Sequence, residues 1–97
     1  MKVNFVATVL RVDTFKTEKR PDPMHNVHLL AEGREFTQVR AQIPTAGKVS
    51  GLDSEKLLTE CRRVETKRGM VQAQCELREY SGKWYFDLVG VTEVKVG

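Results

Sequence analysis

The apolar residues of this chain repeat at helical spacing in one segment, residues 53–69, and at every second position on both sides of it. In the helical segment the apolar positions are Leu57, Leu58, Cys61 and Val64, set among Glu, Lys and Arg. Asp53 suits an N-cap, and Gly69 follows the basic residues at the far end. The sequence therefore predicts one helix of about three turns in a chain that is otherwise made of strands.

Three strands are predicted before the helix. In the first, Val3, Phe5, Ala7 and Val9 share one face, and from Leu10 onward the apolar positions move to even numbers, as they do at a β-bulge. Residues 16–26 hold two prolines and five charged residues, which predicts an exposed loop or a long hairpin tip. Residues 27–31 and 37–43 alternate again, which predicts the second and third strands.

Two strands are predicted after the helix, over residues 70–78 and from residue 84 onward, joined by a hairpin connection at residues 80–83. Trp84 and Phe86 have the phase of Leu88, which predicts that both rings pack in the core. Three strands, one helix and two strands, with a long kinked first strand, is the order of the OB-fold. At 97 residues we expect a single domain, mainly β: a five-stranded OB-fold barrel with one α-helix between strands 3 and 4.

Charge is concentrated near the N-terminus. Residues 1–20 hold five basic and two acidic side chains, which accounts for the whole formal net charge of +3. Such a distribution favours an anionic partner near the first strand and the segment that follows it. The sequence has neither a membrane-spanning apolar stretch nor the pattern of a signal peptide, so we expect a cytoplasmic protein with no membrane partner.

Catalytic and metal-binding patterns are missing from the sequence. The serines lie in no strained nucleophile motif, the glycines are scattered, and the acidic residues show no converging pattern. Cys61 and Cys75 are far apart, and with His25 and His28 they do not match the ligand spacing of a zinc finger. We expect a protein that is not an enzyme, with two buried thiols and with no metal or cofactor.

The closing segment resembles a known group of proteins. Residues 69–77 read GMVQAQCEL and, after a short polar turn, residues 82–94 read GKWYFDLVGVTEV. In this pattern the chain is similar to small OB-fold single-stranded DNA-binding proteins, of the bacterial and phage type or the primosomal replication type. The resemblance implies a function in DNA replication or recombination of a phage or mobile element. The chain departs from these families in lacking a glycine in the first strand and in having few aromatics in the third.

The binding site on an OB barrel usually crosses strands two and three and is flanked by the connections between strands one and two and between strands four and five. Basic groups would contact phosphates there, and aromatic rings would stack on bases. The residues predicted to bind nucleic acid are Lys16, Lys19, Arg20, Arg34, Phe36, Gln38, Arg40, Tyr80, Lys83 and Tyr85. Two alternatives stay open: Phe36 packs at the barrel end instead, and the three basic residues of the first connection are only solvated. The basic residues of the helix are interpreted as a plain polar face.

Together these features predict a non-catalytic protein that binds single-stranded DNA without strong sequence preference. We expect a homo-oligomer, a dimer or tetramer, because Val6, Leu30 and the apolar residues of segment 91–96 would be exposed on a single subunit. One alternative is a protein-interaction or assembly module on the same barrel without nucleic-acid binding. Another is an RNA-binding module, which would differ in contacting 2′-hydroxyl groups.

Overall fold

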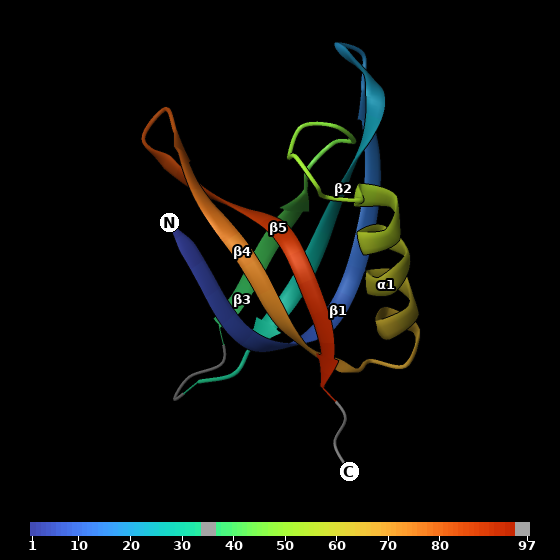
Figure 1. Cartoon of the computed structure of the whole chain (residues 1–97), viewed down its shortest axis with the longest axis vertical. Helices are drawn as coiled ribbons and strands as arrows, with labels where there is room; N and C mark the ends of the chain where they lie inside the picture. Colours follow the sequence, from blue (N-terminus) through green and yellow to red (C-terminus); the bar gives the residue numbers. More distant parts are fainter. Residues whose placement is uncertain (34–36, 95–97) are drawn as a thin grey trace.

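The computed structural model of the chain describes residues 1–33 and 37–94, and within them all side chains except those of Thr17, Arg20 and Pro21. Five strands and one helix follow one another along these residues (Figure 1). In chain order they are β1 (Lys2–Thr17), β2 (Arg20–Ala31), β3 (Thr37–Ile43), α1 (Ser54–Thr66), β4 (Met70–Tyr80) and β5 (Lys83–Val94). The predicted order of three strands, one helix and two strands is confirmed.

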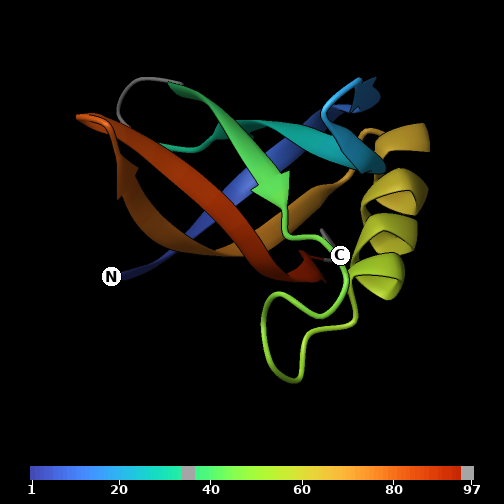
Figure 2. The same cartoon turned by 90° about the horizontal axis from the view of Figure 1, so that it is seen from above.

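The strands form a closed barrel in the order β1-β2-β3-β5-β4. β1 is antiparallel to β2 on one edge and to β4 on the other, and β3 and β5 form a parallel pair. α1 lies against one side of the barrel next to β1 (Figures 1 and 2). The fold is therefore a mainly-β, five-strand closed barrel with a single helix between strands 3 and 4, an arrangement compatible with an OB-fold.

The predicted bulge in the first strand is present. Val9 is the register partner of Leu29, whereas the next pair joins Arg11 to His28, so Leu10 is the extra residue. Its φ is not positive, so the bulge forms without a glycine. Beyond the bulge the Val12 N–H donates a hydrogen bond to the Glu65 carboxylate of α1. The bulge lets one strand pair with β4 through its first half and with β2 through its second half.

Most of residues 16–26 belong to strands, so the loop alternative was wrong and the long-hairpin alternative is confirmed. β1 continues to Thr17 and β2 begins at Arg20, and these two residues are partners across the turn. Pro21 and Pro23 fit in β2 because pairing with β3 begins only at His25, and a proline is tolerated where one strand edge is open. The hairpin projects beyond the barrel, at the upper end of Figure 1.

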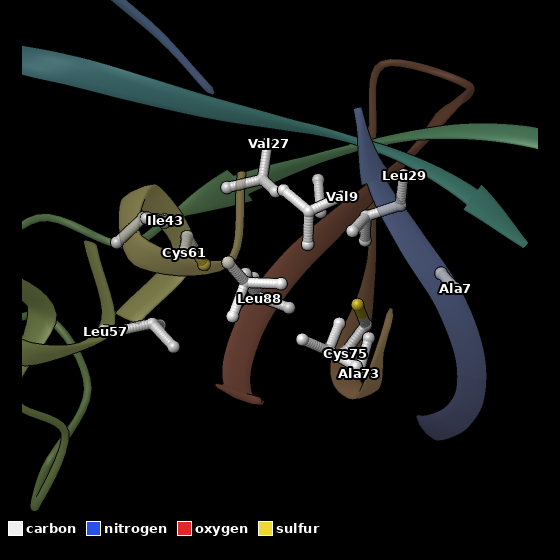
Figure 3. Close-up of a cluster of buried hydrophobic side chains, with 13 residues drawn as sticks. Ala7, Val9, Val27, Leu29, Ile43, Leu57, Cys61, Ala73, Cys75 and Leu88 are labelled. Carbon is white, nitrogen blue, oxygen red and sulfur yellow. The ribbon is translucent and has the colours of Figure 1, made fainter. Parts of the chain in front are cut away.

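The core fills the barrel and extends under the helix (Figure 3). Its buried members among the described residues are Ala7, Val9, Val27, Leu29, Ala41, Ile43, Leu57, Cys61, Val64, Val71, Ala73, Cys75 and Leu88. Both cysteines are free thiols, and burial raises the pKa of Cys61 to about 12 and that of Cys75 to about 11. At neutral pH both side chains are therefore protonated and act as small apolar groups.

The helix ends follow the sequence signals with one correction. Asp53 is the N-cap, and its side chain accepts a hydrogen bond from the Lys56 N–H at 3.0 Å. At the other end the left-handed residue is Arg68, with φ 47°, rather than Gly69. The Gly69 N–H donates to the Val64 carbonyl and the Arg68 N–H to the Glu65 carbonyl, both at 3.0 Å, which is a Schellman motif.

The predicted hairpin connection between the last two strands is also confirmed. Ser81 and Gly82 both have positive φ, 51° and 76°, as a two-residue type I′ turn requires. Tyr80 and Lys83 are the partners that flank the turn. No helix in the described part of the chain has the length and apolar character needed to cross a bilayer.

Candidate nucleic-acid interface

A groove of about 620 Å³ runs along β3, between β5 and the end of β1. It opens where β3 and β5 separate. Figure 2 shows the ribbons of the two strands diverging from one end. Within the described residues they are paired at Ala41↔Phe86 and Gln42↔Asp87, and the preceding residues of each strand line the groove instead. The lining residues are Phe15, Asn26, Thr37, Gln38, Val39, Arg40, Gln42, Lys83, Trp84, Tyr85 and Phe86.

Part of the groove lining is the outer face of β2 and β3, which we call the floor of the groove. Ala41 and Ile43 are buried, so the alternate residues Gln38, Arg40 and Gln42 face outward. Gln42 is the register partner of Asn26 on β2. On the other side of β3, Gln42 is the partner of Asp87, so Tyr85, two residues before Asp87, shares this outer face.

Aromatic rings are concentrated at the groove. Phe15, Trp84, Tyr85 and Phe86 line it, although the whole chain has only seven aromatic residues. The Trp84 side chain is 59% exposed and that of Phe15 is 41% exposed. Exposed aromatic rings side by side with polar groups are the usual platform for unstacked bases.

The prediction that Trp84 packs in the core was wrong. Along the same face of β5, Leu88 is fully buried, Phe86 packs against the core and is partly exposed, and Trp84 is mostly exposed. The reason is that β4 and β5 continue past the barrel as a hairpin, where Trp84 is opposite the exposed Glu79. The side chain of Trp84 still lies on the same strand face as Leu88, but at the end of the hairpin that face has no core to pack against.

The cations of the groove are available to a ligand. Arg40 is exposed on β3 and Lys83 is exposed at the start of β5. Neither forms an ion pair with any residue that the structure describes. No acidic residue occurs among the described side chains that line the groove, so the local charge is positive. Such a surface attracts phosphate groups.

Arg78 is a neighbour of the groove that is not among the predicted binding residues. Its guanidinium donates from Nε to Asp87 Oδ2 at 3.0 Å, and its carbon Cζ lies 5.1 Å from the centre of the Tyr85 ring. The hydrogen bond to Asp87 is the main cause of a raised pKa for Arg78. Arg78 is thus paired with a carboxylate, and its guanidinium lies over the ring of a residue that lines the groove.

The ten predicted binding residues fall into three groups. Gln38, Arg40, Lys83 and Tyr85 come together in the groove. Lys16, Lys19 and Tyr80 are exposed on the two hairpins, near their turns; Tyr80 is 66% exposed. Arg20 is placed by its backbone at the turn of the first hairpin, whereas Arg34 and Phe36 lie outside the described residues.

Besides Trp84 and Phe86, the groove has four lining residues that the sequence did not predict, Phe15, Asn26, Thr37 and Val39, together with Gln42, which the alternation of the third strand puts on the same outer face as Gln38 and Arg40. Phe15 could have been found from the sequence. Past the bulge at Leu10 the inward residue is Val12, so the alternation puts Asp13 and Phe15 on the outer face. Asn26 was missed because residues 16–26 were treated as a connection, although Asn26 is paired within β2.

Ion pairs account for part of the basic face of α1. Arg63 donates to Glu60 at 2.8 Å, and Lys67 pairs with Glu93 of β5 at 2.6 Å. The hydrogen bond from Lys67, followed by nearby positive charge, lowers the pKa of Glu93. Arg63 also approaches Glu93 at 3.4 Å, so both cations have carboxylate partners and are less available to phosphate than those of the groove.

A second hollow of about 370 Å³ lies between the start of β2, the segment after β3 and the start of α1. Its lining includes Asp22, Glu55 and His25, whose Nδ1 is 2.8 Å from Thr14 Oγ1. Burial, and then the charge of Arg62, lowers the pKa of His25. With two carboxylates and a neutral histidine in its lining, this hollow is a poorer match for phosphate than the groove.

Among the described residues, no three His, Cys, Asp or Glu side chains are grouped closely enough to hold a metal ion. Comparisons with known protein families, with curated proteins and with solved structures found no match. The class that the structure itself defines is a closed five-strand barrel with one helix and with an aromatic, positively charged groove along β3.

Proposed function

We propose that this chain is a non-catalytic protein that binds single-stranded DNA in the groove along β3, with little sequence preference. The observation that carries the proposal is the composition of the groove. It combines four aromatic rings with two cations, Arg40 and Lys83, that have no ion-pair partner among the described residues. Rings suit the faces of unpaired bases, and cations suit the phosphates between them.

The two projecting hairpins extend this surface. Lys16 and Lys19 are exposed on the hairpin between β1 and β2, and Tyr80 is exposed on the hairpin between β4 and β5. A single-stranded DNA longer than the groove would contact the two lysines on one hairpin and the Tyr80 ring on the other. The resemblance of the sequence adds the expected setting, DNA replication or recombination of a phage or mobile element.

The test is a titration of a labelled single-stranded DNA with the protein at two salt concentrations, followed by fluorescence anisotropy, with duplex DNA as competitor. Binding that weakens with salt and resists the duplex supports the proposal, because phosphate contacts release counterions. An absence of binding at low salt would overturn it. Trp84 is the single tryptophan of the chain, so its fluorescence gives a second measure of groove occupancy. An RNA strand of the same sequence tests the RNA-binding alternative.

A different observation favours a second candidate, a protein-interaction or assembly module. Over residues 37–40 the described pairing of β3 is with β2, and over residues 83–85 that of β5 is with β4, so two strand edges face the groove. Open edges of this kind accept an added strand from a partner. This function becomes the favoured one if no nucleic acid binds at low salt.

A homo-oligomer, a dimer or tetramer, is also part of the proposal. Val6 and Leu30 are half-buried on the outer face of the barrel, and Val94 near the end of β5 is 36% exposed. Burying these side chains between subunits would remove apolar surface from water. Light scattering coupled to size-exclusion chromatography measures the mass directly, and a monomer at micromolar concentration would contradict this part of the proposal.

A further inference from the structure

Three amide side chains lie in the groove: Asn26, Gln38 and Gln42. Asn26 and Gln42 are register partners on the outer face of β2 and β3, and Gln38 lies on the same face of β3. None of these side chains has a hydrogen-bond partner within the part of the chain that the structure describes. Each amide has a carbonyl acceptor and two N–H donors, so the floor of the groove offers both kinds of group to a ligand.

In the strand order, the strands that carry these amides lie between the strands that carry two exposed aromatic rings. Phe15 belongs to β1 and Trp84 to β5, whereas the amides belong to β2 and β3, which lie between those strands in the barrel. A base that stacks on either ring uses its face for the stacking. Its edge is then left to contact the strands of the floor, where the amides are.

We propose that Asn26, Gln38 and Gln42 bind the Watson–Crick edges of unpaired bases, so that the groove recognises the edge that a duplex hides. This inference rests on the proposed function, and it specifies which part of the DNA the amides contact. Arg40 and Lys83, on the same groove, are left to contact the phosphates.

The chemistry of the four bases explains how one set of amides can serve them all. Every Watson–Crick edge has a donor beside an acceptor: N6–H and N1 in adenine, N3–H and O4 in thymine, N4–H and N3 in cytosine, and N1–H and O6 in guanine. A carboxamide offers an acceptor beside a donor, and a half-turn of its terminal group exchanges their positions. The same side chain therefore fits each base, while in a duplex these atoms are already bonded to the opposite strand.

The test compares three labelled strands of about 15 nucleotides, a length within the site size of one barrel. The first strand is made of thymidine nucleotides. The second is made of N3-methylthymidine nucleotides, which lack the N3–H donor. The third is made of deoxyuridine nucleotides, which lack only the 5-methyl group of thymidine. We expect the methylated strand to bind roughly tenfold more weakly than thymidine. The deoxyuridine strand should bind within about twofold of thymidine, because its Watson–Crick edge is intact.

The double variant Gln38→Leu with Gln42→Leu assigns the effect to the amides. It should bind thymidine more weakly than the unchanged protein and should lose most of the difference between thymidine and N3-methylthymidine. Gln72→Leu is the matched control, because Gln72 is an exposed glutamine on β4, opposite Val6 and outside the groove lining. Circular dichroism of each variant confirms that the barrel is folded.

The outcomes separate the two proposals. Equal binding of thymidine and N3-methylthymidine would overturn the inference while the proposed function stands. A methylation penalty that persists in full in the double variant would also overturn it, since the edge would then be contacted by other groups. If the unchanged protein fails to bind the thymidine strand at all, the proposed function is wrong and this inference is wrong with it.

Discussion

The guanidinium of Arg78 lies 5.1 Å from the centre of the Tyr85 ring while it donates to the Asp87 carboxylate at 3.0 Å. Arg78 and Tyr85 are register partners on β4 and β5, and both are half-buried. One side of the Tyr85 ring is thus occupied by a cation that its own strand pair holds in place. Tyr85 also lines the groove, whereas Arg78 does not.

Arg78→Lys should weaken DNA binding through Tyr85. Lysine keeps the positive charge but cannot form the two-pronged contact with Asp87 or stack flat on a ring, so Tyr85 loses its support. We expect the affinity for a thymidine strand to fall about three- to tenfold. The salt dependence should be unchanged, because no phosphate contact is removed. Arg63→Lys on α1, another ion-paired arginine, is the control, and an unaltered affinity in Arg78→Lys would contradict the role given to Arg78.

Trp84→Ala should separate binding from stability. The ring is 59% exposed, so its removal should change the free energy of unfolding by less than about 1 kcal/mol. Loss of one stacking platform, at about 1–3 kcal/mol per base, should weaken DNA binding by roughly 5- to 150-fold. Leu88→Ala, in the fully buried part of the same strand face, should instead cost about 2–5 kcal/mol of stability. A large loss of stability in Trp84→Ala, measured by urea unfolding, would show that the ring is part of the core after all.

Arg40→Gln and Lys83→Gln should each remove one phosphate contact. For single strands, the slope of the logarithm of affinity against the logarithm of salt concentration should become shallower by about 0.7 for each lost contact. Lys48→Gln is the control, because Lys48 is exposed on the segment between β3 and α1 and outside the groove lining. If the slopes of both groove variants equal that of Lys48→Gln, these cations do not contact phosphate.

Arg68→Gly should stabilise the protein. Arg68 has φ 47°, a left-handed conformation that strains a side chain with a Cβ atom and that glycine adopts freely. We expect the free energy of unfolding to rise by roughly 0.5 kcal/mol after the entropy of the added glycine is included. Thr59→Gly, in the exposed middle of α1, should lower it by about the same amount. A fall in the melting temperature of Arg68→Gly would contradict this account of the helix end.

His25 should make stability depend on pH. Burial, and then the charge of Arg62, lowers the pKa of His25 in the folded state. The unfolded chain, with a histidine pKa of about 6.5, then takes up its proton first as the pH falls. The stability that neutral His25 contributes is therefore present above about pH 6.5 and is lost as the pH falls toward the lowered folded pKa. In His25→Asn the free energy of unfolding should vary less between about pH 7 and 5, and identical pH profiles would show that His25 does not contribute.

The sequence was sufficient for the architecture because alternation and helical spacing are local signals. Ala7, Val9, Cys61 and Val64 were all placed inward, and all are buried. The bulge at Leu10 was visible as a change of phase, since a shift by one residue exchanges the two faces of a strand.

The groove was only partly predictable, because its shape depends on how far each strand extends beyond the barrel core. Trp84 has the inward phase, and its exposure follows from the length by which β4 and β5 extend past the barrel. The prolines of β2 suggested a loop, although an open strand edge tolerates them. Asn26 and Gln42 become neighbours through register across two strands, which no local pattern encodes.

The short parallel ladder between β3 and β5 couples the shape of the barrel to whatever fills the groove. Every other junction of the barrel is an antiparallel ladder of at least seven paired positions, whereas Ala41↔Phe86 and Gln42↔Asp87 are the two described pairs that complete the ring. Breathing of the protein should therefore begin at this junction, where the fewest hydrogen bonds must break. A ligand that contacts both strands opposes that opening, so occupancy should slow amide exchange at Ala41 and Phe86 before it affects the rest of the barrel.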